Sequence, residues 1–362
     1  MRLDGLRVLI VHEWIVTWAG SERCVEQMLQ LFPEAELVVG VLDTRLRGLN
    51  DTTRRARESW LRFLPGSASH HRWFLPLHPL AFASLDTSGY DLVISSSHAF
   101  AKAVRVRPSA HHVCYCHSPP RYLYDQAHAY ERAGRLSGLV LRAAAPALRA
   151  VDRWAARGVG TFIANSAYVA ERISRVYDRS ATVVHPPVAR KVTGETCPPR
   201  GDFLLAFGRL VPYKRVDLAI SAANRLALPL VVAGDGPERA ALERIAGPTV
   251  SFRGAVTERE AAELLSSARA VVFCAEEDFG IAPLEANAHG TPVVAYGRGG
   301  AAETVVEGET GVLFQKQSED DVVRAIQLCF AITWDVEKLW TNAEKFSPAR
   351  YRRELREVIE AL

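Results

Sequence analysis

The sequence predicts an α/β protein made of two doubly wound domains, in each of which helices cover both faces of a parallel sheet. Short apolar runs alternate with longer helix-like segments along the whole chain, which is typical of strands buried on both faces. This rhythm stops at a proline-rich stretch, residues 186–200, and then restarts. The 362 residues, 48% of them apolar, suffice for two separate cores. We therefore expect one domain over residues 1–190, a second over 191–345, and a terminal helix over 346–362.

The first domain opens with a strand, a small-residue turn and a helix. An apolar run over residues 6–12 predicts the strand, and residues 19–29 predict the helix. Gly20, in the turn between them, would let a phosphate approach the backbone N–H groups at the helix start. The pattern Gly-x-Gly-x-x-Gly does not occur in the chain, so we do not expect a nicotinamide site.

Two further apolar runs, residues 91–95 and 112–116, predict the next strands of this domain. His117 follows the second run, so we expect it at the edge of the sheet where parallel strands end and ligands bind. Prolines and aromatic residues after it predict a rigid wall. A histidine in this position is suited to contact a ligand, although a single histidine is more often structural.

A dense group of histidines and cysteines, residues 111–117, invites comparison with a zinc site. On a strand, His112, Cys114 and Cys116 would share one face while His117 points to the other, which does not suit a tetrahedral ion. The chain also lacks the Asp-x-Asp pair with which many enzymes hold a nucleotide-sugar through a metal. We therefore expect no metal and no other cofactor.

Arginines alternate with aromatic and apolar residues in two segments, residues 54–74 and 132–157, the second of which predicts an amphipathic helix with a basic face. Residues 1–190 hold 24 Lys and Arg against 16 Asp and Glu, whereas residues 191–362 hold 20 against 25. These segments could contact an anionic membrane or an acceptor sugar, or could simply be packed or solvated surface. No pattern of a known RNA or DNA module accompanies them, so we expect no nucleic-acid partner.

Two cations follow the first strand of the second domain. Residues 203–207 predict this strand, Arg209 stands in the loop after it, and Lys214 stands at the expected start of the next helix. Permanent positive charges near a helix N-terminus suit a diphosphate. A later strand-end loop, residues 250–254, contributes Arg253.

Glu277-Asp-Phe-Gly-Ile-Ala-Pro-Leu-Glu285 is the most informative stretch of the second domain. It follows an apolar run, residues 270–274, so we expect a strand, a tight loop and then a helix. Gly280 in the loop would let a phosphate approach the unpaired N–H groups of that helix. Glu277 precedes the helix and Glu285 lies inside it, so one carboxylate could meet the sugar of a ligand and the other a second polyol.

Together these motifs resemble glycosyltransferase family 4, the retaining enzymes of GT-B fold that use nucleotide-diphospho-sugars. The resemblance is carried by Glu-x7-Glu with Phe-Gly after its first glutamate, by Ala-x3-Gly-Thr-Pro-Val-Val-Ala after it, and by Gly-Arg-x4-Lys from Gly208. The first turn is similar to the family's Gly-Gly-x-Glu-Arg, with Ala19 in place of the first glycine. The resemblance implies two Rossmann-like domains facing across a cleft, the first binding the acceptor and the second the donor, and a C-terminal helix that crosses back to the first.

The resemblance also implies roles for single residues. Arg209 and Lys214 would stabilise the diphosphate as it leaves, Glu277 would orient the donor hexose, and Glu285 would bind the ribose. His117 would contact the sugar from the first domain, which completes the catalytic set with Glu277, Arg209 and Lys214. The other residues expected at the donor are Gly20, Arg253, Phe279, Gly280 and Ile281.

Residues 12–14, 95–98 and 114–122 look most like the family's branch of bacterial O-antigen mannosyltransferases. This likeness implies transfer of mannose from GDP-mannose to a lipid-linked oligosaccharide in surface polysaccharide assembly. The alternatives are a UDP-sugar donor, a GT-B nucleotide-sugar epimerase that needs no acceptor, and a nucleotide-binding module without turnover. The presence of both Glu277 and His117 argues against the last of these.

The sequence predicts a cytoplasmic protein. It has no uncharged apolar run of 18 residues and no signal-peptide pattern before the first strand. Its six cysteines are scattered through predicted strands and helices, which suits reduced thiols. Any membrane contact would then be peripheral, on the inner face of the plasma membrane.

Overall fold

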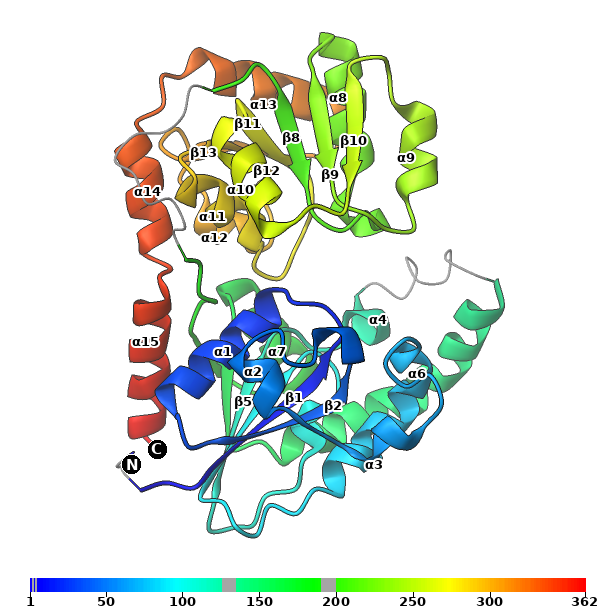
Figure 1. Ribbon diagram of the computed structural model, residues 1–362, viewed down its shortest axis with the longest axis vertical. Helices are drawn as coiled ribbons and strands as arrows, with labels where there is room; N and C mark the ends of the chain where they lie inside the picture. Colours follow the sequence, from blue (N-terminus) through cyan, green and yellow to red (C-terminus); the bar gives the residue numbers. More distant parts are fainter. Residues whose placement is uncertain (2, 4, 126–134, 190–199) are drawn as a thin grey trace. The chain divides into compact units, whose positions relative to one another are not determined.

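The computed structural model describes residues 1–362 except for residues 2, 4, 126–134 and 190–199. The chain divides into two compact units, one formed by Met1–Pro187 with Ala349–Leu362 and the other by Val188–Pro348. Each unit is a parallel sheet flanked by helices (Figure 1), so the predicted class of two doubly wound Rossmann-like domains is confirmed. Most of the proline-rich stretch lies outside the described residues, and the cleft expected from the family stays a prediction.

The first unit contains a seven-stranded parallel sheet in the order β3-β2-β1-β4-β5-β6-β7. Its strands are β1 (Val8–Ile15), β2 (Glu36–Leu42), β3 (Arg57–Glu58), β4 (Leu92–Ser97), β5 (His111–Cys116), β6 (Thr161–Ala164) and β7 (Ala181–Val183). Its α-helices are α1 (Gly20–Leu31), α2 (Asp51–Arg55), α3 (His78–Ala83), α4 (Arg121–Tyr124), α6 (Arg135–Arg157) and α7 (Ala167–Tyr177). The strand order reverses between β1 and β4, and ligands of open parallel sheets bind at the carboxyl ends of strands at such a point.

Both faces of this sheet are buried, as the continuous apolar strands predict. Alternate residues of β1 enter different clusters, with Val8 and Ile10 on one face and Leu9 and Val11 on the other. β5 alternates in the same way, since Cys114 packs on the opposite face from its neighbours Val113 and Tyr115. The period of two therefore fixes which side chains of each strand end can share a site.

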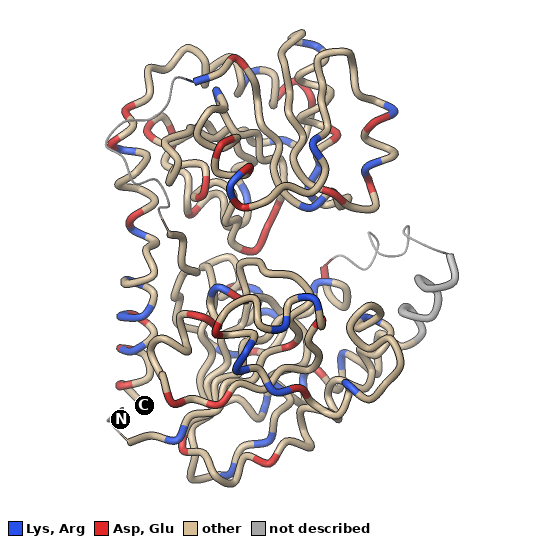
Figure 2. The backbone as a smooth tube through the Cα atoms, viewed as in Figure 1, with Lys and Arg blue, Asp and Glu red and all other residues tan. Residues whose placement is uncertain are grey.

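The last helix, α15 (Pro348–Glu360), packs on the first unit although it follows the second in sequence. Tyr351, Leu355 and Ile359 recur every four residues, so they form one stripe that is completely buried in the core of the first unit. The leucine and the isoleucine each contribute about 1.5–3 kcal/mol when buried. Basic and acidic residues both occur along this helix (Figure 2), and Arg353 and Glu357 form an exposed pair on it.

The second unit contains a six-stranded parallel sheet in the order β10-β9-β8-β11-β12-β13. Its strands are β8 (Leu204–Phe207), β9 (Leu230–Ala233), β10 (Val250–Gly254), β11 (Ala270–Phe273), β12 (Val293–Tyr296) and β13 (Gly311–Phe314). Its helices are α8 (Val216–Leu226), α9 (Arg239–Ile245), α10 (Glu258–Ser267), α11 (Ile281–Ala288), α12 (Ala301–Thr304), α13 (Glu319–Ala331) and α14 (Val336–Glu344). The strand order reverses between β8 and β11.

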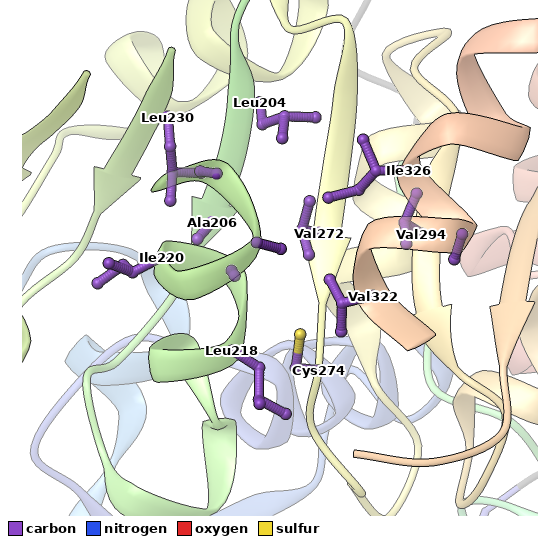
Figure 3. Close-up of a cluster of buried hydrophobic side chains, with 14 of the residues drawn as sticks. Leu204, Ala206, Leu218, Ile220, Leu230, Val272, Cys274, Val294, Val322 and Ile326 are labelled. Atoms are coloured by element: carbon purple, nitrogen blue, oxygen red, sulfur yellow. The ribbon is translucent and has the colours of Figure 1, made fainter. Parts of the chain in front are cut away.

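The core of the second unit lies on both faces of its sheet. On one face, Leu204 and Ala206 of β8 pack with side chains of α8 and α13, which Figure 3 shows meeting over the sheet. On the other face, Leu205 packs with Val271 and with Ala282 of α11. This packing holds β8 and β11 side by side, so the loops that follow them start from a rigid base.

No helix in the described part of the chain is long and apolar enough to span a membrane. The cysteines that the structure describes are all buried and free of disulfides.

Candidate functional site

The loops after β8 and β11 start side by side, at the point where the strand order of the second unit reverses. β8 pairs with β9 on one side and with β11 on the other. The loop after β8 carries Arg209 and Lys214, and the loop after β11 carries Glu277 and Gly280. The structure thus places these four predicted site residues at the edge where ligands of parallel sheets bind.

Lys214 and Glu277 form an ion pair between the two loops, from Nζ to Oε1. Both side chains are mostly buried, with 16% and 17% of their surface exposed. The amine also lies 5.6 Å from the centre of the Phe273 ring. Burial works against the charged amine, but the carboxylate of Glu277 outweighs this effect and raises the pKa of Lys214 above its usual value. Lys214 is therefore a fixed cation, oriented by Glu277.

The expectation that Lys214 begins a helix is wrong. It ends a short 3₁₀ turn, Pro212–Lys214, and α8 begins only at Val216. Between them Arg215 adopts a left-handed conformation with φ 50°, which interrupts the helical path. The turn directs the amine toward the end of β8, where a Cβ at Gly208 would lie only 3.4 Å from Nζ.

The N-terminus of α11 has no side-chain cap. Gly280 is the N-cap residue, at φ 76°, and it has no side chain with which to accept a hydrogen bond from the first turn. The positive φ favours glycine, and a Cβ there would lie 3.3 Å from the Phe273 ring. Uncapped N–H groups and the helix dipole together attract an anion at this end.

A glycine pair after β12 holds the loop that carries Glu277. Gly300 donates its N–H to the carbonyl of Glu277 at 2.9 Å. A Cβ at Gly300 would lie 2.1 Å from the carbonyl oxygen of Phe279, and one at Gly299 would lie 2.4 Å from that of Glu277. Only glycine permits this approach. We did not predict this role, and the run Gly-Arg-Gly-Gly after a predicted strand was the signal for it.

A small pocket opens beside the ion pair. Its lining includes Gly208, Arg209, Lys214 and Phe273. Arg209 is exposed and makes no ion pair with any residue that the structure describes. Its guanidinium is therefore available to an anionic ligand at this pocket.

The other predicted donor residues differ in their position and exposure. Glu285 is half-buried inside α11, and Ile281 is the first residue of that helix. The side chain of Phe279 is only 3% exposed and packs 5.8 Å from the ring of Phe346, so only its backbone could meet a ligand. Arg253 is exposed on β10, which β9 separates from β8, so the fold does not bring it beside Lys214.

Gly20 and His117 lie in the first unit. Gly20 is the first residue of α1 and is half-buried. His117 follows β5 directly, and its Nε2 lies 2.8 Å from the hydroxyl of Ser96. Burial and the neighbouring His98 and His12 hold the pKa of His117 well below its usual value. His117 is therefore a neutral hydrogen-bonding group at pH 7.

Two buried charged groups near these strand ends have structural partners. Oε1 of Glu13 accepts hydrogen bonds from the Ser97 hydroxyl at 2.9 Å and from the N–H groups of Ala99 and Ala101 at 2.8 and 2.7 Å. Lys102 lies in a 3₁₀ turn, Ala101–Ala103, and pairs with Asp152 at 2.6 Å, both almost completely buried. Since neither group is open to a ligand, we assign both to the fold.

No group of three or more His, Cys, Asp and Glu in the described ranges is arranged to hold a metal ion. In the cluster of residues 111–117, His112 is bound by the Ser95 hydroxyl at 3.0 Å and the Gly158 carbonyl at 3.2 Å. Cys114 and Cys116 pack in a hydrophobic cluster on the sheet face opposite Tyr115. These side chains thus take part in the hydrogen bonds and the packing of the core.

Family models match both halves of the chain. The model described as Glycosyltransferase Family 4 matches residues 18–191, and the model described as Glycosyl transferases group 1 matches residues 194–346. Together they cover most of each unit and every predicted site residue.

Curated relatives match part of the chain. A glycogen synthase of Mycobacterium tuberculosis is 34% identical over 203 residues, which are 51% of this chain and 49% of the relative. A GDP-mannose-dependent alpha-mannosyltransferase of the same species is 34% identical over 171 residues, which are 46% of this chain and 44% of the relative. The chain thus spans about half the length of these curated relatives.

Solved structures share this fold over nearly the whole chain. Anabaena Alr3699/HepE, crystallised in complex with UDP and glucose, superposes with a TM-score of 0.71 at 17% identity, over 99% of this chain and 100% of the other. At this identity the likeness shows the fold alone.

Proposed function

Since this chain belongs to the family 4 glycosyltransferases of GT-B fold, we propose that it transfers a hexose from a nucleotide-diphospho-sugar to an acceptor hydroxyl, with retention of configuration. The observation that carries the proposal is the pairing of Lys214 with Glu277 beside the uncapped start of α11. A fixed cation, a carboxylate that can bind sugar hydroxyls and amides that attract an anion are the groups that this reaction needs in one place.

The diphosphate is the charged part of the reaction. When the bond between the sugar carbon and the phosphate oxygen breaks, negative charge develops on the leaving diphosphate. Arg209, Lys214 and the first-turn amides of α11 would stabilise that charge without a metal ion. Arg209 gives up no ion pair with a described residue when it binds a phosphate, whereas Lys214 would divide its charge between Glu277 and the ligand.

The carboxylates would bind the two polyols of the donor. Once a diphosphate draws the amine of Lys214 toward itself, Glu277 becomes a stronger acceptor for the hydroxyls of the hexose. Glu285, inside α11, would accept hydrogen bonds from the ribose diol. His117, neutral and half-buried, would exchange one hydrogen bond with the transferred sugar.

We further propose GDP-mannose as the donor and a lipid-linked oligosaccharide as the acceptor, in bacterial surface polysaccharide assembly. The GDP-mannose-dependent relative from M. tuberculosis supports this choice of donor. The alternative is a UDP-sugar donor; the protein crystallised with UDP and glucose shares the fold. The two donors share the diphosphate and differ in the base, so the base decides between them.

A thermal-shift panel of GDP, UDP and ADP tests the donor site. A nucleotide at 100 times its dissociation constant adds about 2.7 kcal/mol of stability. We expect GDP to raise the Tm most and the Arg209→Ala variant to lose most of that rise. A larger rise with UDP would assign a UDP-sugar donor, and no rise with any of the three would contradict the proposed site.

Removal of divalent metal is expected to leave the transfer rate unchanged. The motivating observations are the absent Asp-x-Asp pair and the two cations, Arg209 and Lys214, at the proposed diphosphate position. Initial rates with excess EDTA and with added Mg²⁺ or Mn²⁺ should agree. Loss of activity in EDTA and its recovery with either metal would refute metal-independent transfer.

The basic aromatic segment of residues 54–74 exposes large apolar side chains. Phe63 is 72% exposed, Trp73 is 81% exposed and Trp60 is 38% exposed. The guanidinium of Arg62 lies 4.5 Å from the ring of Phe63. Exposed aromatics beside arginines match the interface of an anionic bilayer, which takes rings at the headgroup level and attracts positive charge. We therefore propose this segment, with the following Leu80 at 62% exposed, as a membrane-contact surface.

The second basic segment, residues 132–157, is only partly described. α6 covers Arg135–Arg157, and residues 132–134 lie outside the described part of the chain. Its described aromatic residue, Trp154, is 45% exposed and lies beside Arg105. The membrane-contact experiment therefore targets the first segment.

The protein is expected to float with anionic liposomes at low salt and to be released at high salt, since each engaged arginine contributes about 1 kcal/mol near the surface. Replacing Phe63 and Trp73 by serine should weaken flotation without loss of fold, because both side chains are exposed. The control is Leu328→Ser, at an apolar residue of the second unit that is 59% exposed. Equal recovery with neutral and anionic lipid would contradict the proposal.

A further inference from the structure

Four polar side chains form a continuous line at the strand ends of the first unit. Oε1 of Glu22 lies 3.6 Å from Nε2 of His12. Nδ1 of His12 lies 3.0 Å from the hydroxyl of Ser96, and that hydroxyl lies 2.8 Å from Nε2 of His117. Glu22, His12 and Ser96 are buried, and His117 is half-buried at the open end of the line. The line therefore connects a buried carboxylate to a histidine that a ligand can reach.

The fold assembles this line from three adjacent strands and one helix. His12 of β1 and Ser96 of β4 are partners in the sheet register. His117 follows β5 and donates its backbone N–H to the carbonyl of Ser97 at 2.8 Å. Glu22 enters from the first turn of α1. Because backbone pairing fixes these positions, the side-chain distances belong to the rigid part of the sheet.

The two oxygens of Glu22 have different tasks. Oε2 accepts hydrogen bonds from the N–H of Ala19 at 2.9 Å and from the hydroxyl of Ser21 at 3.0 Å, which stabilises the start of α1. Oε1 faces His12. Burial works to raise the pKa of Glu22, but His12 and the backbone outweigh it, and the net shift is downward. Glu22 is therefore ionised, and its free oxygen attracts a proton on Nε2 of His12.

The Ser96 hydroxyl has one proton, so it can donate to only one of its two imidazole neighbours. When His12 is neutral, the negative charge of Glu22, 3.6 Å from Nε2, favours the His12 proton on that nitrogen, and Nδ1 accepts the proton of Ser96. Ser96 then accepts a hydrogen bond from His117, whose proton must lie on Nε2. His117 presents Nδ1 to a ligand as a bare acceptor.

Protonation of His12 reverses the direction of both hydrogen bonds that Ser96 makes. A solvent proton binds Nδ1 of His117, the Nε2 proton of His117 passes to the Ser96 oxygen, and the former Ser96 proton passes to Nδ1 of His12. One proton enters, His12 becomes the cation beside Glu22, and His117 stays neutral. His117 now presents an N–H donor at Nδ1.

We propose that Glu22, His12 and Ser96 are positioning residues that set whether His117 offers its ligand an acceptor or a donor at Nδ1. The consequence for transfer rests on the proposed function, in which His117 meets the donor sugar. The acceptor form would bind the proton of a sugar hydroxyl, whereas the donor form would bind an oxygen lone pair. His117 would thus favour one sugar orientation when His12 is neutral and a different one when His12 is protonated.

The groups that face His12 come from each element packed around it. Glu22 faces it from α1, Ser96 from β4 and His98 from the loop after β4, with the His98 ring centre 6.1 Å away. Burial and the neighbouring His12 lower the pKa of His98 to about 3, so His98 stays neutral over the relevant range. Among the described residues, Glu22 is the negative charge within ion-pair distance of His12.

Nitrogen-15 NMR of histidine-labelled full-length protein tests the proposal without any substrate, because the two ring nitrogens report the tautomer directly. His117→Gln identifies the signals of His117. We expect the proton of His117 on Nε2 while His12 is neutral and on Nδ1 once His12 is protonated. In Ser96→Ala the tautomer of His117 should no longer follow the protonation of His12, and the two tautomers of His117 should mix.

A second variant and a matched control make the test specific. Glu22→Gln keeps an oxygen for the helix cap but removes the charge, so the tautomer change should move to lower pH. Ser95→Ala, one residue away, removes one of the two partners of His112 and should leave His117 unchanged. A His117 tautomer that is the same in wild type and Ser96→Ala, or that ignores the protonation of His12, would overturn the proposal. Failure of the proposed function would appear separately, as an absent nucleotide response in the thermal-shift panel.

Discussion

Replacing Lys214 or Arg209 by alanine is expected to lower kcat on the order of a hundredfold or more while leaving the fold intact. Both residues serve a charge that grows as the diphosphate leaves, so their loss should be felt most in the transition state. Arg209 is exposed, and its removal breaks no ion pair with a described residue. Lys214 is mostly buried beside Phe273, so its removal also leaves Glu277 without its cation.

Lys214→Met separates the charge from the packing, because it keeps an unbranched side chain and removes the amine. It should lose as much kcat as Lys214→Ala and should keep more stability. The control is Lys338→Ala, which removes a 52% exposed lysine paired with Glu309 in the same unit and should keep normal turnover. If folded Lys214 and Arg209 variants kept near-normal rates, the proposal that the diphosphate binds at this site would be contradicted.

Glu277→Gln is expected to lower kcat, whereas Glu285→Gln is expected to weaken the binding of the nucleotide. Glu277 faces Lys214 at the point proposed for the transferred hexose, whose position changes as the bond breaks. Its loss should therefore lower mainly kcat, by roughly a hundredfold. Glu285 lies inside α11 and is proposed to hold the ribose, which does not move during the reaction. Its loss should weaken the affinity for free nucleoside diphosphate.

The measurements are kcat with saturating donor and the dissociation constant of the free nucleoside diphosphate, for both variants. Glu309→Gln is a matched control, because it changes an exposed carboxylate of the same unit. If Glu277→Gln loses nucleotide affinity and Glu285→Gln loses only kcat, the two roles are reversed. If neither variant changes either quantity, the loop after β11 does not bind the donor.

Much of the fold and part of the site could be predicted from local patterns. Apolar runs of four to eight residues mark the strands, and the glycine or polar residue after each run marks its end, because a parallel strand buried on both faces tolerates little else. Arg209, Lys214 and Glu277 each follow such a run, so the sequence already places them at strand ends. The alternation in β5 likewise follows from the period of two, which separates Cys114 and Cys116 from His117.

Local patterns could not predict which loops are neighbours. The strand order reverses between β8 and β11, and this order results from how helices and strands far apart in sequence pack together. It brings Glu277 to Lys214 and leaves Arg253 two strands away. The same long-range packing buries Phe279 against Phe346, which its place in a glycine-containing loop did not indicate.

The sequence by itself determined the two βα halves, the chemistry of the residues at the strand ends and the resemblance to the family, because these depend on residue type and spacing along the chain. The tertiary structure decided how those residues are paired. Lys214 meets Glu277, and Glu22 meets His12 and through Ser96 reaches His117, only because strands distant in sequence lie beside one another. An ion pair or a hydrogen bond requires contact within a few ångströms, and in a parallel sheet the strand order sets that contact rather than distance along the chain.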